Sequence, residues 1–484
     1  MRSSRVFASI CAVEPSRYSE IIGNKNGHTL LDQNIAYYIR KNSRIRNKDS
    51  FLHSRIIDKR WSFGDLRKQV EYLSRNLLSM GLRPSERVMS FSYGCFENYL
   101  LQLACSFLGC MYIAIPPEHY TADKLRSYLN QFQPQILYLS DKYQGQTDHA
   151  KFSLYDVLLS VIPELAFSYP GQTVQFEQSQ EFPYLKKCII NGRNGEEIKE
   201  AHKFTHLLPS IHSYHEDHLG RFNLLLHPDE PILSLWNVDP PLEDKTFTSY
   251  SHMHCMNSGS QFTNALGLDS RCRVSFLHRH FSTPLGAIVV PFASLSTGFE
   301  IVLQNEDLLR KSPVDIVAEV NQQNLTCFVG NRVDFERIMN ICGSEHRLSV
   351  NQIAIFEDSS VEETSQDFLL LVKERFKAQD VILFRGPVES CYMVTHRSAN
   401  QGDLGILPYT GLKVVGDRGT YDAKILSRGV RGNLRLRGPH VTPYYYSNAG
   451  LLTEFQDELG WIATSRDGRI EQNGAWIAMK AQIY

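Results

Sequence analysis

The sequence predicts an α/β protein whose sheets are largely parallel, and three observations support this fold class. Segments with helical periodicity alternate with short apolar segments typical of strands in both halves of the chain. The chain has 484 residues, which is long enough to bury a large core and suggests two or three lobes. Its 51 basic and 52 acidic residues nearly cancel, and its composition is that of an ordinary soluble protein.

The first half predicts a series of βα units. Ser62 followed by Asp65 resembles a capping box that opens a helix, and Gly81 is a suitable residue to end it. The elements expected after this helix are a strand at 88–92, a helix at 96–108, a strand at 110–115, a helix at 121–132 and a strand at 136–139. Because strands and helices alternate, a parallel sheet with right-handed crossovers is the simplest architecture.

The second half repeats this alternation. The elements expected there are a strand at 232–236, a helix at 315–322, a strand at 326–329, a helix at 333–341 and a strand at 352–357. Further on, Leu434 and Leu436 alternate with the arginines that flank them, as in a half-buried strand. The pattern therefore predicts that the sheet architecture extends almost to the end of the chain.

Charge and hydropathy exclude several functional classes. A net charge of -1 gives no clustered basic excess, so we expect no nucleic-acid partner. No apolar run is typical of a transmembrane segment; residues 100–117 come closest, but Gly109 and two prolines fit a buried helix and strand better. Peripheral contact with a membrane stays open. The ten cysteines form no C-x-x-C pair, and we interpret them as reduced thiols of a cytosolic or organellar protein.

The first residues are biased toward basic and hydroxyl side chains. Arg2, Arg5 and three serines precede the first acidic residue, Glu14, and this is the composition of a mitochondrial transit peptide. A disordered start with chance basic residues is the alternative. Residues 1–17 are therefore assigned to a transit peptide or a disordered start, in a mitochondrial or otherwise cytoplasmic protein.

One histidine-rich segment could suggest a metal site. Its histidines are His202, His206, His212, His215 and His218. Their spacing matches no standard zinc site, and the surrounding sequence is polar and aperiodic. We interpret residues 194–228 as a solvated loop insertion and predict no metal site.

Three longer segments resemble a known family. Residues 61–141, residues 161–193 and the block GNLRLRGPHVTPYYY at Gly432–Tyr446 resemble the adenylate-forming superfamily, and especially its acyl-CoA synthetases. The second segment is similar to the mitochondrial branch called acyl-CoA synthetase family member two. The resemblance implies that residues 18–484 form the AMP-binding large N-terminal domain of that family. This domain consists of two βα-layered subdomains and a small β-barrel-like subdomain.

The resemblance also locates the phosphate loop, in which the family carries glycines, hydroxyl side chains and a lysine that hold the phosphates of ATP. At the hydroxyl and glycine positions this chain has Val238, Asp239, Pro240, Pro241 and Leu242. Lys245 stands at the lysine position. Without glycines the backbone cannot form an anion-binding nest, and the added carboxylate repels phosphate.

Other nucleotide contacts of the family are also altered. Residues 357–359 replace a glycine-rich turn, and Arg385 replaces the tyrosine that stacks on adenine. Val388 replaces a threonine, whereas Glu389 matches the glutamate that reaches the magnesium ion in the family. The structural alternative for Glu389 is a carboxylate that holds a loop.

The position of the ribose-binding aspartate has changed as well. Where the resemblance places Thr-Gly-Asp, this chain has Thr464, Ser465 and Arg466, and Asp467 follows one residue late. An arginine at this position inverts the charge. Lys245, Glu389 and Asp467 are therefore the remnants of an ATP and magnesium site.

The expected acyl-binding region is ambiguous. The segments 285–290 and 292–295 are apolar enough to line a hydrophobic pocket, but plain core packing would need the same residues. His278 and His280 lie near the place of a family histidine but out of register, and we interpret them as structural. The sequence reaches Tyr484 near the point where the family's hinge begins, and we expect the small C-terminal domain to be absent.

The sequence therefore predicts an acyl-CoA synthetase-like protein of fatty acid metabolism that has lost ATP-dependent adenylation. It would act by binding or scaffolding, with a fatty acid, an acyl group or a protein as partner. The alternative is a divergent medium-chain fatty acid–CoA ligase, active alone or completed by a partner. ATP and magnesium would be cofactors only in that case. A shortened product of a longer gene is a third possibility.

Overall fold

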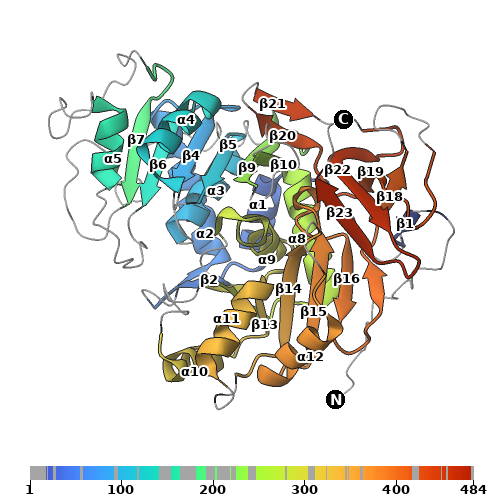
Figure 1. Cartoon of the computed structure of the whole chain (residues 1–484). Helices are drawn as coiled ribbons and strands as arrows, with labels where there is room; N and C mark the ends of the chain where they lie inside the picture. Colours follow the sequence, from blue (N-terminus) through green and yellow to red (C-terminus); the bar gives the residue numbers. More distant parts are fainter. Residues whose placement is uncertain are drawn as a thin grey trace.

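Three sheets organise the chain in the computed structural model (Figure 1). The structure describes residues 18, 20–24, 29–54, 58–91, 96–116, 119–140, 154–163, 181–191, 202–203, 219, 225–237, 247–277, 281–303, 311–322, 324–343, 346, 348–359, 363–416, 424–447, 450–453 and 456–480. Two of the sheets have nine strands each, and the third has five.

The first sheet is mainly parallel. In spatial order its strands are β21 (Gly450–Thr453), β20 (Tyr444–Ser447), β10 (Phe247–Ser251), β9 (Pro231–Trp236), β5 (Met111–Ile115), β4 (Arg87–Phe91), β6 (Ile136–Ser140), β7 (Lys187–Asn191) and β8 (His202–Lys203). The strands from β9 to β8 are parallel, while β10, β20 and β21 extend the sheet in antiparallel fashion. The predicted strands at 88–92, 110–115, 136–139 and 232–236 are confirmed to within one residue or two at each end.

The second sheet has the same mixed character. Its spatial order is β17 (Leu404–Ile406), β16 (Thr395–Ser398), β15 (Asp380–Gly386), β14 (Gln352–Asp358), β13 (Cys327–Asn331), β11 (Arg273–Phe276), β12 (Glu300–Leu303), β2 (Ser50–Ser54) and β3 (Lys59–Ser62). The strands from β15 to β2 are parallel. This confirms the predicted α/β class for both halves of the chain.

Helices cover the two large sheets and separate them. They are α1 (Ile35–Ile45), α2 (Phe63–Ser79), α3 (Phe96–Leu108), α4 (Ala122–Phe132), α5 (Leu154–Val161), α8 (His252–Leu266), the π-helix η5 (Leu285–Val289), α9 (Val290–Thr297), α10 (Pro313–Gln322), α11 (Arg332–Cys342), α12 (Gln366–Arg375) and the 3₁₀ turn η7 (Val388–Ser390). Helix α2 begins with the capping box that the sequence predicted, since Ser62 and Asp65 exchange side-chain and backbone hydrogen bonds.

The largest core lies between the two nine-stranded sheets. Figure 1 shows α8 and α9 at the centre of the molecule, and their apolar side chains share one cluster with strands of both sheets. Tyr112 and Leu233 come from the first sheet, and Val329 and Phe384 from the second. Most residues of α8 and α9 are buried, and α8 places polar side chains such as His252, Asn257 and Gln261 in this interior beside the apolar ones.

The third sheet is small and antiparallel, with the order β1 (Glu20–Ile22), β18 (Gly411–Val415), β19 (Gly432–Arg437), β22 (Ile462–Ile470) and β23 (Trp476–Lys480). Leu434 and Leu436 are buried in its core, as predicted. The expectation of exposed arginines beside them is wrong for Arg435, which is 1% exposed. Both faces of β19 are therefore covered at that residue. Among the described helices, none has the length and hydropathy needed to cross a bilayer.

Candidate functional site

Part of the predicted site lies outside the described residues. This applies to Val238, Asp239, Pro240, Pro241, Leu242 and Lys245, and also to His206, His212, His215, His218, His278 and His280. His202 lies in β8, but its side chain is outside the described set. The residues that the structure does place are Arg385, Val388, Glu389, Arg466 and Asp467.

Glu389 lies in the 3₁₀ turn η7, which follows β15 at the edge where the parallel strands of the second sheet end. Its side chain is completely buried. The hydroxyl of Tyr445 donates a hydrogen bond of 2.5 Å to Oε1, and Nε of Arg466 lies 3.8 Å from the same oxygen. Oε2 has no hydrogen-bond partner within the part of the chain that the structure describes.

The turn that carries Glu389 is fixed through its backbone. Thr442 N–H donates to the carbonyl oxygen of Glu389 at 2.9 Å, and the Tyr250 hydroxyl donates to the carbonyl of Val388 at 2.5 Å. Cys391 and Tyr392 follow with φ values of 52° and 63°, in the left-handed region that such residues seldom adopt. The turn therefore reverses the chain sharply after β15 and holds the carboxylate toward β20 and β22.

Arg466 is buried beside Glu389. It lies in β22 of the third sheet, and its side chain is 0% exposed, like that of its partner. An arginine stays charged in proteins, so the pair is an ion pair away from water. The structure thus brings together two residues that the sequence analysis treated separately, one as a remnant and one as a loss.

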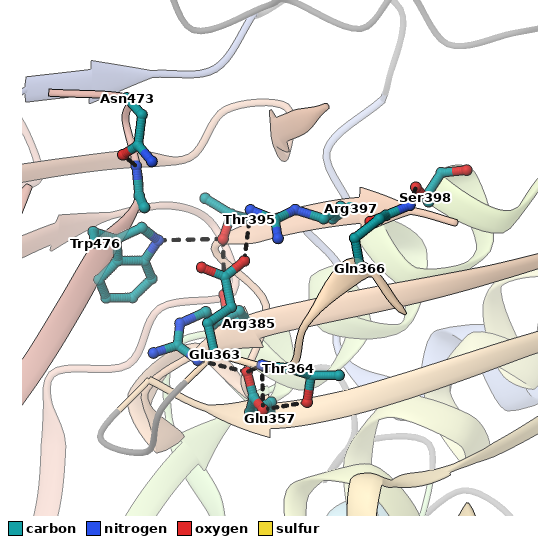
Figure 2. A network of polar contacts seen from close by, with 11 residues as sticks. Glu357, Glu363, Thr364, Gln366, Arg385, Thr395, Arg397, Ser398, Asn473 and Trp476 are labelled. Carbon is teal, nitrogen blue, oxygen red and sulfur yellow. Dashed lines mark hydrogen bonds and ion pairs between the residues drawn. The ribbon is translucent and has the colours of Figure 1, made fainter. Parts of the chain in front are cut away.

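A second buried pair joins Glu357 of β14 to Arg385 of β15, as Figure 2 shows. Nη1 of Arg385 donates to Oε2 of Glu357 at 2.5 Å, and Nη2 donates to the carbonyl oxygen of Ser359 at 3.1 Å. Glu357 also accepts hydrogen bonds from the backbone N–H and the hydroxyl of Thr364. Its carboxylate is therefore well satisfied.

This pair was not predicted, although the sequence holds a signal for it. Glu357 and Arg385 are register partners in the parallel ladder between β14 and β15. Aligning the apolar run at 381–384 with the predicted strand at 352–357 would have placed the acid beside the base. Val388 and Glu389 lie just beyond the end of the same ladder.

The segment after Glu357 is held against the next strands (Figure 2). Glu363 forms an ion pair of 2.7 Å with Arg397 of β16, and Nε2 of Gln366 donates to the carbonyl of Ala399 at 2.9 Å. On the other side of β16, Nε1 of Trp476 donates to Oγ1 of Thr395 at 3.2 Å. The third sheet is thereby tied to the second close to the Glu357–Arg385 pair.

Asp467 does not join the cluster around Glu389. It forms an ion pair of 3.1 Å with Arg431, which is 36% exposed, near the surface of the third sheet. Its strand position is opposite Asn433 of β19. The prediction that Asp467 serves a nucleotide site stays untested.

Burial controls the ionisation of the groups near Glu389. Desolvation raises the pKa of Tyr445 well above its usual value, and the neighbouring Glu389 carboxylate raises it further. Desolvation also raises the pKa of Tyr250 and lowers the pKa of His440 to about 4. The phenols and this imidazole are therefore neutral at neutral pH, and the charge close to Glu389 comes from Arg466.

The divalent cation that the fold family implies does not fit these residues. Magnesium prefers six oxygen ligands, and a fixed positive charge nearby opposes its binding. Within the described part of the chain there is no group of three or more His, Cys, Asp or Glu side chains that could hold a metal ion. Next to Glu389 the structure supplies a buried guanidinium instead.

The predicted acyl-binding segments are buried in the central core. Residues Leu285–Val289 form the π-helix η5, and α9 continues directly from it. A Cβ atom on Gly259 of α8 would lie 2.2 Å from the backbone nitrogen of Ala293, so the two helices pack backbone to backbone there. These contacts are those of a close-packed core, and the pocket stays a prediction.

The chain is similar to known proteins in sequence. A model of the AMP-binding enzyme family matches residues 43–185. YngI of Bacillus subtilis (strain 168), named as a proposed acyl-CoA synthetase, is 22% identical over 423 residues, covering 86% of this chain and 72% of YngI. The mitochondrial medium-chain acyl-CoA ligase ACSF2 of Mus musculus is 28% identical over 138 residues, which are 28% of this chain and 20% of ACSF2.

Solved structures agree at the level of the fold. The N-terminal domain of FACL13 from Mycobacterium tuberculosis superposes with a TM-score of 0.67 and 12% identity, covering 93% of this chain and 100% of that domain. The anthranilate CoA ligase AuaEII, solved with anthranoyl-AMP, gives a TM-score of 0.69 and 16% identity over 93% of this chain and 78% of that protein. The fold is therefore that of the large domain of adenylate-forming enzymes. In sequence the chain is similar to acyl-CoA synthetases, and part of it matches the AMP-binding enzyme family.

Proposed function

We propose that this chain is an acyl-CoA synthetase-like protein of fatty acid metabolism that has lost ATP-dependent adenylation and acts by binding or scaffolding. The observation that carries the proposal is the buried ion pair between Arg466 and Glu389. In the family that the chain resembles, the corresponding glutamate reaches a magnesium ion and the residue at 466 is an aspartate that binds ribose. Here the two side chains contact each other instead.

Electrostatics supports this proposal. A magnesium–nucleotide complex needs carboxylates and oxygen ligands around the metal, and Arg466 adds a permanent positive charge 3.8 Å from the Glu389 carboxylate. Two charges at this separation interact by roughly 4 kcal/mol at the effective dielectric constant typical of proteins. A cation approaching Glu389 would meet a repulsion of similar size from Arg466.

The Glu357–Arg385 pair supports the same conclusion. The resemblance expects a glycine-rich turn and a stacking tyrosine at these positions, so that the flat face of adenine can be covered. The chain has two charged side chains there, both at most 4% exposed and joined at 2.5 Å. The phosphate-loop positions 238–242, which lack glycine, add a further reason from the sequence.

The alternative function is a divergent medium-chain fatty acid–CoA ligase, active alone or completed by a partner. Its support is the presence of Glu389 and Lys245 and the medium-chain acyl-CoA ligase named among the relatives. ATP and magnesium would then be cofactors, and contacts to phosphate would come from residues other than the family's loop.

Calorimetric titration separates the two functions. The purified chain is titrated with Mg-ATP and, separately, with a non-hydrolysable acyl-adenylate analogue, and acyl-CoA formation from ATP, CoA and octanoate is assayed in parallel. We expect no binding heat from either nucleotide and no acyl-CoA. Micromolar binding together with acyl-CoA formation that Glu389→Gln abolishes would overturn the proposal and establish the ligase.

The location of the protein and its domain limits are part of the same proposal. We infer that residues 1–17 direct the chain to mitochondria and that residues 18–484 form the AMP-binding domain. The basic, acid-free start and the mitochondrial relative ACSF2 support this. A fluorescent protein fused behind residues 1–17 should enter mitochondria, whereas a fusion with Arg2 and Arg5 changed to glutamate should not.

A further inference from the structure

We propose that Glu389, Arg466 and Tyr445 form a junction that fastens the three sheets of this protein to one another by an internal charge pair, without nucleotide or metal. We call these three residues the Glu389 junction. The proposal concerns how the fold is held in one arrangement, and it is independent of whether any adenylation activity persists.

The three residues come from three different sheets. Glu389 follows β15 of the second sheet, Tyr445 lies in β20 of the first sheet and Arg466 lies in β22 of the third sheet. All three are buried, and both contacts converge on the same oxygen, Oε1 of Glu389. One carboxylate therefore links sheets whose strands are far apart in the sequence.

Hydrogen bonds to the backbone around the carboxylate also join the first sheet to the turn that carries Glu389. The hydroxyl of Thr442 donates to the carbonyl of Ser249 in β10 at 2.6 Å, while its N–H donates to the carbonyl of Glu389. The Tyr250 hydroxyl donates to the carbonyl of Val388. The loop that leads from β19 to β20 is thus fixed to the first sheet and to the turn that carries Glu389.

Charge makes this junction sensitive to the loss of either partner. A buried carboxylate or guanidinium left without its counter-charge destabilises a protein far more than the intact pair stabilises it. The other ionisable groups that act on this site are Tyr250 of β10, Tyr392 after the turn and Tyr445, all of whose pKa values burial raises. Asp358 raises the pKa of Tyr392 further, and Cys391 is a neutral thiol.

A double-mutant cycle tests the pair. Glu389→Gln and Arg466→Gln should each raise the unfolding equilibrium constant by about 10²-fold, because each breaks an ion pair between two completely buried side chains. The double variant should be destabilised by much less than the product of the two single effects, because either change alone already breaks the pair. Effects that simply multiply would show that the two side chains are not coupled and would overturn the proposal.

Hydrogen exchange followed by mass spectrometry tests the link among sheets. In Arg466→Gln, the amides of residues 388–393, 444–447 and 462–467 should lose protection together, although they belong to three sheets. The matched control is Arg435→Gln, which removes a similarly buried arginine from the neighbouring strand β19. Loss of protection confined to β22 in Arg466→Gln would contradict the junction.

If Arg466→Gln fails to fold, Tyr445→Phe keeps the ring and removes only the hydroxyl that donates to Oε1. It should reduce amide protection in both 444–447 and 388–393, and an effect limited to 444–447 would contradict the junction. These readouts are separate from the nucleotide titration. A chain that binds Mg-ATP could still show energetic coupling between Glu389 and Arg466, and a chain that does not bind ATP could still lack this coupling.

Discussion

The two buried ion pairs of this protein differ in how they are built. Glu357 and Arg385 lie at the same register of adjacent strands, 2.5 Å apart, and both oxygens of Glu357 accept hydrogen bonds. Glu389 and Arg466 belong to different sheets, lie 3.8 Å apart and leave Oε2 of the glutamate without a hydrogen bond among the described residues. The first pair is local and its carboxylate is saturated with hydrogen bonds, whereas the second is long-range and its carboxylate is not.

The difference shows two ways in which this fold accommodates a buried charge pair. The first pair is a contact between adjacent strands, which stabilises its own neighbourhood. The second pair depends on the relative placement of three sheets, so it reports on tertiary structure. Buried polar groups without a hydrogen bond are costly and uncommon. The Glu389 carboxylate, whose Oε2 lacks a hydrogen bond among the described residues, is therefore less well satisfied than that of Glu357.

The largest effect should come from breaking the saturated pair. Glu357→Gln removes the charge that Arg385 faces and weakens the hydrogen bonds from Thr364, and removing one partner of a buried pair costs about 3–5 kcal/mol. We expect the free energy of unfolding, measured by urea denaturation, to fall by this amount.

The control for this prediction is Glu363→Gln, which breaks the neighbouring ion pair with Arg397, whose two side chains are about one fifth exposed. That change should cost about 1 kcal/mol or less. Equal effects of the two variants would mean that burial does not distinguish the pairs, and the comparison between saturated and exposed contacts would fail.

Acidification should lower the free energy of unfolding by an intermediate amount. Two buried histidines, one beside the Glu389 turn and one in β16, should each contribute to this change. Desolvation lowers the pKa of both His440 and His396 to about 4. His440 lies beside the turn that carries Glu389, and His396 lies in β16, opposite Phe384 of β15. Since both are neutral in the folded state and have a pKa near 6.5 when unfolded, their stabilisation is present above pH 6.5 and is lost as pH falls toward 4. Each contributes up to about 1.4 kcal/mol per pH unit in that window.

Substitution of each histidine by glutamine should remove its share of this pH dependence. The slope of the unfolding free energy between pH 6 and pH 4.5 should decrease in His440→Gln and in His396→Gln, and the double variant should show the sum of the two decreases. His227→Gln is the matched control because its side chain is 68% exposed, and it should leave the slope unchanged. An unchanged slope in both buried variants would contradict the burial argument.

The sequence was sufficient for the fold because periodicity and capping are local properties. The helix that begins after Ser62 and the strands expected at 88–92 and 352–357 were predicted from their own residues, and the structure has these strands at Arg87–Phe91 and Gln352–Asp358. Only part of the candidate site could be predicted from local sequence. Arg466 was identified as a charge inversion by its motif position, but its contact with Glu389 depends on how the second and third sheets meet.

The burial of Arg435 shows the same limit. Alternation within one strand predicts which residues share a face, but it does not predict that the second face is also covered. By contrast, the Glu357–Arg385 pair could have been found from the sequence, because its partners share a register that two apolar strands define.

The smallest effect should come from Asp467, the predicted remnant that the structure places apart from the Glu389 junction. Its ion pair with Arg431 is 3.1 Å long and partly exposed, and such pairs contribute about 0–1 kcal/mol. Asp467→Asn should therefore change the free energy of unfolding by less than 1 kcal/mol, and 0.5 M salt should reduce the difference further because it screens exposed charges. A cost as large as that of Arg466→Gln would mean that the acidic residue one position late also takes part in joining the sheets, and the contrast between the two neighbours in β22 would disappear.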